Sequence, residues 1–152
     1  MKRITVLLAD DHAPVRKALK KILELEADLA VVGEAKNGRQ AVTLVEKLRP
    51  DLVLMDVTMP LLNGLQATSQ ILKAFPATRV LMLSAHQDEA YIVESVKSGA
   101  SGYLIKQTST DQICPAIREV HKGNTFYSAS IPKRLQQRSP KKASKAPLGT
   151  DN

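Results

Sequence analysis

Five short apolar runs alternate with five amphipathic segments along most of this sequence, and that alternation limits the folds available to it. The runs cover residues 4–9, 29–32, 52–55, 80–83 and 103–105. Such short, nearly continuous apolar runs are typical of strands that are buried on both faces of a sheet. Strands that alternate with helices along a chain form parallel sheets with helices on both sides. The sequence therefore predicts an α/β fold with a five-stranded parallel sheet.

The sequence offers two possible starts for the last of the predicted helices. Ser109 with Gln112 resembles a capping box, which would start the helix there. Pro115 follows a few residues later, and inside a helix it would remove one backbone hydrogen bond. We therefore expect this helix either to be kinked or to begin later, near Cys114.

Polar residues stand where the predicted strands end. Asp10 and Asp11 follow the first run, Asp56 follows the third, Ser84 follows the fourth and Lys106 follows the fifth. In open parallel sheets, ligands bind beside the carboxyl ends of the strands, where the strand order reverses. These five side chains are therefore expected to converge on one crevice, although about a hundred positions separate the first from the last.

Three carboxylates, a hydroxyl and an ammonium group suit phosphoryl transfer. Converging carboxylates repel one another unless a cation lies between them. Mg²⁺ prefers one or two carboxylates, waters and a phosphate oxygen, and Mn²⁺ could replace it. A transferred phosphoryl group needs its equatorial oxygens neutralised, which Mg²⁺, Lys106 and Ser84 could do together. Asp56 is the expected nucleophile, because carboxylates can form acyl phosphates.

Five motifs in order give a resemblance to a known family. The chain resembles the receiver domains of two-component response regulators, most closely those of the NarL/FixJ (LuxR-type) class, over about residues 3–125. The motifs are Ala9-Asp10-Asp11-His12, Leu54-Met55-Asp56-Val57-Thr58-Met59-Pro60, Asn63-Gly64, Leu83-Ser84-Ala85 and Gly102-Tyr103-Leu104-Ile105-Lys106.

The resemblance implies a fold and a phosphorylation site. The fold would be flavodoxin-like (CheY-like), a doubly wound (βα)5 unit with strand order 2-1-3-4-5. Asp56 would be the phosphorylated residue and Asp11 a direct metal ligand. Asp10 would act as the partner of Asp11, often through water, and the backbone carbonyl of Thr58 would be a further ligand.

The resemblance also implies a conformational switch. Ser84 would be the switch hydroxyl, Tyr103 the switch aromatic and Lys106 the lysine that assists phosphorylation. Tyr103 can equally be read as a packing residue. His86 would lie at the rim of the site, where it could influence attack by water.

Two features depart from the family pattern. Many members have proline after the lysine, with a cis peptide bond, whereas this chain has Gln107, which predicts an ordinary trans bond. NarL/FixJ-like regulators continue into a helix-turn-helix domain, and this chain stops at Asn152 without room for one. We therefore expect either the receiver part of a DNA-binding regulator or a stand-alone receiver that acts by protein contact.

The charge of the chain is concentrated near its C-terminus. The net charge is +7, and residues 131–152 hold six Lys and Arg against one Asp. This segment has no apolar periodicity, so residues 1–125 are predicted to form the receiver domain and residues 126–152 a basic linker or disordered tail. No aromatic residue follows Tyr127, which gives little support to binding of single-stranded nucleic acid.

The remaining features indicate a cytoplasmic protein. Cys114 is the single cysteine, which excludes an internal disulfide. No apolar run approaches the roughly 18 residues of a membrane span, so no membrane contact is expected. The expected partners are a sensor histidine kinase or phosphotransfer protein, a second copy of the chain on phosphorylation, and DNA only through an absent C-terminal domain.

Other functional classes fit the sequence less well. A Mg²⁺-dependent phosphohydrolase with an aspartyl-phosphate commonly carries a second aspartate two residues beyond the nucleophile, where this chain has Thr58. A nucleotide-binding flavodoxin-like module would need a phosphate loop after the first strand, and Asp10 and Asp11 would repel the phosphates. We therefore expect a protein that catalyses only its own phosphorylation and dephosphorylation rather than an enzyme.

Overall fold

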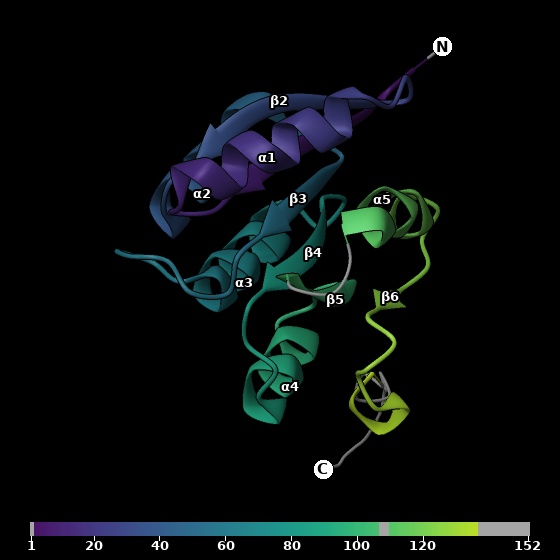
Figure 1. Cartoon of the computed structure of the whole chain (residues 1–152). Helices are drawn as coiled ribbons and strands as arrows, with labels where there is room; N and C mark the ends of the chain where they lie inside the picture. Colours follow the sequence, from purple (N-terminus) through teal and green to yellow (C-terminus); the bar gives the residue numbers. More distant parts are fainter. Residues whose placement is uncertain (1, 107–109, 137–152) are drawn as a thin grey trace.

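The computed structural model describes residues 2–106 and 110–136. Strands and helices alternate through most of this part of the chain (Figure 1). The elements are β1 (Ile4–Ala9), α1 (Ala13–Glu24), β2 (Leu29–Ala35), α2 (Gly38–Leu48), β3 (Leu52–Met55), α3 (Gly64–Ala74), β4 (Arg79–Ser84), α4 (Glu89–Lys97), β5 (Gly102–Ile105), the 3-10 turn η2 (Thr110–Gln112), α5 (Ile113–His121), β6 (Phe126–Tyr127) and the 3-10 turn η3 (Lys133–Leu135).

The sheet is parallel and has the strand order β2-β1-β3-β4-β5-β6. The order predicted for the first five strands is confirmed. The prediction of five strands is wrong by one, because β6 pairs with β5 in the described part of the chain. A strand of two residues is too short to produce a periodic pattern, which explains why sequence reasoning passed over it.

Alternate residues of each strand enter two separate hydrophobic cores. Leu7 and Ala9 of β1 pack with residues of α2, α3 and α4 on one face of the sheet. Val6 and Leu8 pack with residues of α1 and α5 on the other face. Both faces of the sheet are therefore covered by helices (Figure 1), which accounts for the nearly continuous apolar runs in the sequence.

Asparagine residues occupy the N-cap positions of α2 and α3. The side chain of Asn37 accepts a hydrogen bond from the backbone N–H of Gln40 at the start of α2. Asn63 and Gln66 form a reciprocal capping box at the start of α3. These bonds satisfy backbone donors that would otherwise lack partners within the helix.

The last helix begins at Ile113, near the later of the two expected positions. Pro115 therefore lies in the first turn, where a missing backbone N–H costs no intrahelical bond. Ser109, the expected capping residue, and Gln107, with its expected trans bond, lie outside the described residues.

The segment after α5 packs on the domain. The backbone N–H of Ser128 donates to Tyr103 O, and the hydroxyl of Ser128 accepts from the N–H of Ile105. Ile131 and Leu135 are 4% and 7% exposed and belong to the same core as α4. Residues 126–136 were expected in a linker or tail, whereas the structure packs them against β5 and α4. The expected tail beyond Gln136 lies outside the described residues.

Within the described residues, no helix is both long enough and apolar enough to cross a bilayer.

Candidate functional site

The parallel register brings the predicted side chains to one edge of the sheet. Ala9 lies opposite Met55, and Met55 lies opposite Met82. Asp10 and Asp56 each follow one of these aligned strand ends directly, so their carboxylates are neighbours. The two strands are also joined at this edge by the backbone N–H of Asp56, which donates to the carbonyl of Ala9 at 2.9 Å.

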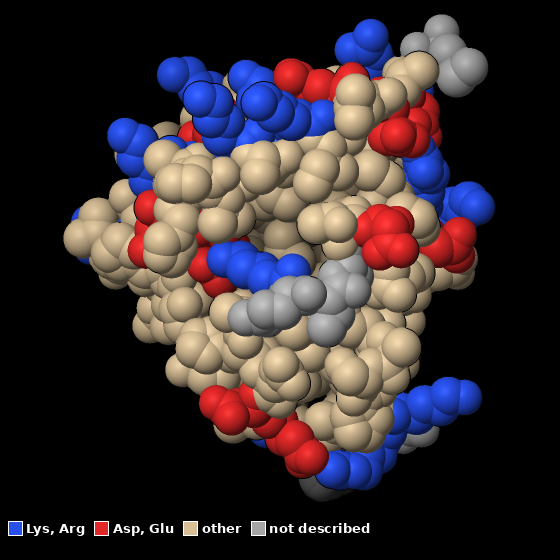
Figure 2. All heavy atoms as spheres, viewed as in Figure 1, with Lys and Arg blue, Asp and Glu red and all other residues tan. Residues whose placement is uncertain are grey.

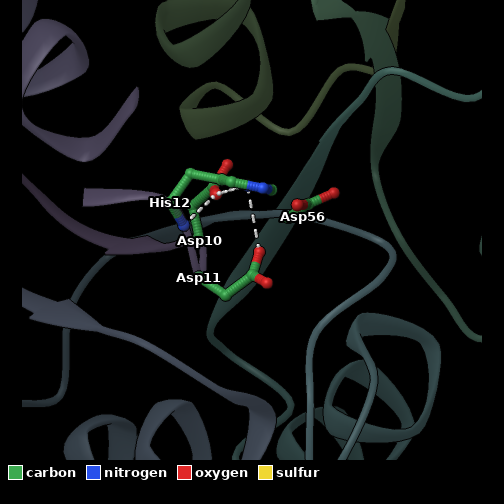
Figure 3. Close-up of side chains that lie close together, drawn as sticks. All are labelled: Asp10, Asp11, His12 and Asp56. Carbon is green, nitrogen blue, oxygen red and sulfur yellow. Dashed lines mark hydrogen bonds and ion pairs between the residues drawn. The ribbon is translucent and has the colours of Figure 1, made fainter. Parts of the chain in front are cut away.

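Four side chains form an acidic cluster at this edge (Figure 3). One ligand atom each of Asp10, Asp11, His12 and Asp56 lies within 4.8 Å of the others. Asp10 and Asp56 are almost fully buried, at 2% and 4% exposure, while Asp11 and His12 reach solvent. The cluster thus has a buried inner side and an open outer side.

Lys106 lies between the two buried carboxylates. Its ammonium nitrogen is 2.7 Å from Asp10 Oδ2 and 3.3 Å from Asp56 Oδ2. Burial by itself would lower the pKa of Lys106, but the hydrogen bond with Asp10 and the charges of Asp56 and Asp10 outweigh it, so the pKa is raised. Lys106 therefore remains a cation at neutral pH.

The carboxyl group of Asp56 has a raised pKa. Burial is the largest cause, because it disfavours the charged form, and the nearby charge of Asp10 adds to it. Lys106 and the backbone N–H of Thr58 act in the opposite direction. The Thr58 N–H lies 3.4 Å from Asp56 Oδ1, so each carboxylate oxygen faces a donor.

Gly64 fixes the backbone of Asp56 from the other side. Its N–H donates to the carbonyl of Val57 at 2.7 Å. A methyl group on Gly64 would lie 1.9 Å from the backbone oxygen of Asp56, so only glycine allows this contact. The Asn63-Gly64 pair therefore begins α3 and also positions the loop that carries Asp56.

His12 is the member of the cluster that sequence reasoning missed. It occupies the N-cap position of α1 but makes no side-chain capping bond. Its Nδ1 lies 3.2 Å from carboxylate oxygens of both Asp10 and Asp11, and its backbone N–H donates to Asp10 Oδ1 at 2.9 Å. Its position directly after two aspartates was the signal that could have identified it.

Ser84 and Tyr103 meet at the loop that contains His86. The fully buried hydroxyl of Ser84 accepts from the backbone N–H of His86 at 3.1 Å. The hydroxyl of Tyr103 donates to the His86 carbonyl at 2.8 Å, and the residue is fully buried. Burial raises the pKa of Tyr103, although a hydrogen bond with Ser84 opposes this. Tyr103 is thus a packed residue here, in contact with the hydroxyl predicted to switch.

The His86 side chain lies beside Thr58. Its Nε2 lies 3.4 Å from the hydroxyl of Thr58, and its ring lies 4.5 Å from the ring of Tyr91 between centroids. The structure thus brings together Asp10, Asp11, Asp56, Thr58, Ser84, Tyr103 and Lys106 as predicted.

The acidic cluster could hold a metal ion. Carboxylate oxygens are the donors that hard divalent cations prefer. Lys106 already supplies one positive charge to Asp10 and Asp56, and the open outer side leaves Asp11 accessible. The donor set therefore fits a small, hard cation that retains several waters.

Comparison with known proteins identifies the family. A model of the response regulator receiver domain matches residues 6–118. The chain belongs to this family. It is 38% identical over 133 residues to the transcriptional regulatory protein DegU of Brevibacillus brevis, covering 88% of this chain and 56% of DegU. It is 42% identical over 120 residues to LnrK of Bacillus subtilis, covering 79% of this chain and 54% of LnrK.

A solved structure agrees with this assignment. A two-component response regulator of the LuxR family from Aurantimonas sp. superimposes with a TM-score of 0.81 at 29% identity, covering 94% of this chain and all of that one. The receiver spans only a little more than half the length of the curated relatives DegU and LnrK.

Basic side chains of the receiver gather over α1, at the top of the view in Figure 2. Lys17 and Lys21 are exposed there and Lys20 is half-buried. These lysines lie one to two turns beyond the start of α1, which follows Asp10, Asp11 and His12 directly.

Proposed function

We propose that this receiver accepts a phosphoryl group on Asp56 and that the modification changes how the protein binds a partner. The observation that carries the proposal is the buried Asp56 carboxylate with the Lys106 ammonium 3.3 Å away and two further aspartates beside it. A buried carboxylate among other carboxylates is costly unless it is used or compensated.

The direct ligands of Mg²⁺ would be Asp11, Asp56 and the backbone carbonyl of Thr58. Asp10 would bind the ion directly or through water. Mn²⁺ could replace Mg²⁺. When bound, the ion supplies positive charge to the carboxylates and to one phosphoryl oxygen. Asp11 is the exposed aspartate of the cluster and would complete the site when the ion binds.

Asp56 acts as the nucleophile in this proposal. One carboxylate oxygen forms a bond to phosphorus, and the bond between phosphorus and a histidine nitrogen of the donor breaks. The electron pair of that bond leaves with the histidine ring. Lys106 neutralises one phosphoryl oxygen and the hydroxyl of Ser84 donates to another, so the charge that develops meets prearranged partners.

Ser84 and Tyr103 would pass the change to the surface. The Ser84 hydroxyl can leave the His86 N–H and turn toward the phosphoryl group. Because Tyr103 is bonded to the carbonyl of the same His86, movement of this loop changes the surroundings of the ring. The phosphorylated aspartate would thereby bias the surface of β4, α4 and β5 between two arrangements.

A sensor histidine kinase or a phosphotransfer protein is the proposed donor. The proposed output is regulation of transcription, since relatives such as DegU and LnrK are named transcriptional regulatory proteins. DNA contact would require a C-terminal domain, and phosphorylation would favour a homodimer. Action by protein contact alone is the alternative output. The protein would work in the cytoplasm and catalyse only its own phosphorylation and dephosphorylation.

Labelling by acetyl phosphate in the presence of Mg²⁺ tests the assignment. Intact-mass spectrometry should detect one added phosphoryl group on the wild-type chain and none on Asp56→Asn. Asp111→Asn is a matched control, because it makes the same chemical change at an exposed position that is not a member of the cluster. Labelling of Asp56→Asn at the wild-type level would refute the assignment.

A further inference from the structure

A buried arginine contacts the backbone of the acidic cluster. Arg16 lies in α1, and its side chain is 9% exposed. Its Nη1 donates to the backbone carbonyl of Asp10 at 2.6 Å, and its Nε donates to Glu34 Oε1 at 3.0 Å. Charged side chains are rarely buried without a purpose or a partner. The two contacts join α1, the end of β1 and β2 at the acidic cluster.

The Asp10 backbone is held from both sides by this arrangement. Its N–H donates to the carbonyl of Ala35 in β2 at 3.0 Å, and its carbonyl receives the Arg16 guanidinium. The carbonyl of Asp10 belongs to the same planar peptide unit as the nitrogen and Cα of Asp11. A donor that fixes this carbonyl therefore fixes the position of the Asp11 Cα, from which the Asp11 side chain projects.

In the part of the chain that the structure describes, the side chain of Asp11 has few contacts of its own that would hold its orientation. Its side chain is 31% exposed, and its ion-pair contact within the described residues is the ring of His12, which is itself 64% exposed. By contrast, Asp10 is buried and bonded to both His12 and Lys106. The accessible metal ligand thus depends on its backbone for orientation.

We propose that Arg16, held by Glu34, is a positioning residue that orients Asp11 for metal binding. The inference rests on the proposed Mg²⁺ site. Glu34 compensates the charge of the guanidinium, so Arg16 can bond to a neutral carbonyl close to a cation site without adding a net positive charge. The planar fork of arginine allows both bonds at once, which a lysine ammonium on a flexible stem does not reproduce.

The direction in which Mg²⁺ affinity changes in an Arg16 variant shows whether Arg16 acts by positioning Asp11 or only through its charge. Removing a positive charge beside a cation site should tighten Mg²⁺ binding if charge alone matters. If Arg16 positions Asp11, Arg16→Met should weaken Mg²⁺ binding by about tenfold to a hundredfold, as loss of supporting partners around a metal does. Calorimetric titration of the full chain with Mg²⁺ measures this difference.

Lys17→Met is the matched control. Lys17 neighbours Arg16 in the same helix, carries the same charge and is exposed. This variant should bind Mg²⁺ as tightly as the wild type or slightly more tightly. Arg16→Lys keeps the charge and the stem, and it is the second test should Arg16→Met fail to fold. It should also weaken Mg²⁺ binding, because one ammonium cannot replace the fork.

A metal-free readout completes the test. The backbone N–H of His12 donates to Asp10 Oδ1, so its hydrogen exchange reports whether the Asp10–His12 turn is held. Exchange at His12 should be faster in both Arg16 variants and unchanged in Lys17→Met. Wild-type Mg²⁺ affinity together with wild-type exchange at His12 in a folded Arg16 variant would overturn the inference. A wild-type chain that binds no Mg²⁺ would instead refute the proposed metal site.

Discussion

Lys106 is closer to Asp10 than to the proposed phosphoacceptor, with its ammonium nitrogen 2.7 Å from Asp10 Oδ2 and 3.3 Å from Asp56 Oδ2. In the metal-free protein the lysine therefore neutralises a residue that would also serve the metal. Lys106 would therefore have two opposing effects. Its positive charge would assist transfer of the phosphoryl group, but it would also repel Mg²⁺.

Lys106→Met should separate these roles. Without the ammonium, Mg²⁺ should bind more tightly by roughly threefold to tenfold, equivalent to about 1 kcal/mol. Labelling by acetyl phosphate should fall by at least about tenfold, because a prearranged partner for the phosphoryl oxygens is lost. Calorimetry and intact-mass spectrometry measure the two effects. Lys97→Met, which removes an exposed charge on α4, is the control, and wild-type labelling of Lys106→Met would show that the lysine is not needed.

Asp56→Asn should make the metal-free protein more stable and less sensitive to pH. Burial and the charge of Asp10 raise the pKa of Asp56 in the folded state. A raised pKa means that the folded state binds its proton more tightly than the unfolded state does. The stabilisation is thus present at acid pH and is lost as the pH rises through the folded pKa. The amide carries no charge at any pH and avoids this loss.

Thermal unfolding in EDTA between about pH 4 and pH 8 measures the effect. The midpoint of Asp56→Asn should exceed that of the wild type most at the alkaline end, and the difference should shrink toward acid pH. Asp111→Asn should follow the wild type throughout. A constant difference between Asp56→Asn and the wild type would mean that titration of Asp56 is not its cause.

Gly64→Ala should disturb the site through the backbone. The new methyl group would lie 1.9 Å from Asp56 O and 3.0 Å from Val57 Cα, both of them main-chain atoms. Relief requires α3 or the Asp56 loop to shift, at a cost of about 1–3 kcal/mol for overpacking. Chemical denaturation should register this loss, and Mg²⁺ affinity should fall with it.

Gly33→Ala provides the comparison for that experiment. There the nearest atoms are the flexible ends of the Leu48 and Leu7 side chains, which can move. Its effect on stability should be smaller and its effect on Mg²⁺ affinity absent. Equal losses of Mg²⁺ affinity in the two variants would show that the contact of Gly64 with Asp56 has no special role.

The site was predictable because its residues follow from strand register. Asp10, Asp56 and Lys106 each follow an apolar strand directly, and parallel strands bring such positions to one edge of the sheet. Arg16 was not predicted as a site residue, because no local sequence pattern indicates its contacts. A lone arginine in an amphipathic helix reads as a solvated residue, and its partner Glu34 lies eighteen positions away in another element. Only the packed structure shows that Arg16 contacts both Glu34 and the backbone carbonyl of Asp10.

The C-terminal edge of the domain was predicted less well. Ile131 and Leu135 are four residues apart, which is the spacing of one helical turn, but Lys133 and Arg134 stand between them and charge dominates the local composition. Burial of two apolar side chains depends on a surface formed by α4 and β5, which no local pattern reveals.

The effect of shortening the chain on stability should therefore depend on whether residues 131–136 are kept. A chain that ends at Ser130 loses Ile131 and Leu135, whose burial stabilises the fold by roughly 3–5 kcal/mol together, as an upper bound. It also loses the ion pair between Arg134 and Glu89, which is exposed and adds little. A chain that ends at Gln136 keeps all of these contacts and should match the full chain in urea unfolding.

Both shortened chains keep the residues of the acidic cluster, so each should be labelled by acetyl phosphate wherever it remains folded. The difference should appear as a lower urea midpoint for the chain that ends at Ser130. Equal midpoints for the two chains would show that residues 131–136 lie on the surface without stabilising the fold, and would place the edge of the domain before Ile131.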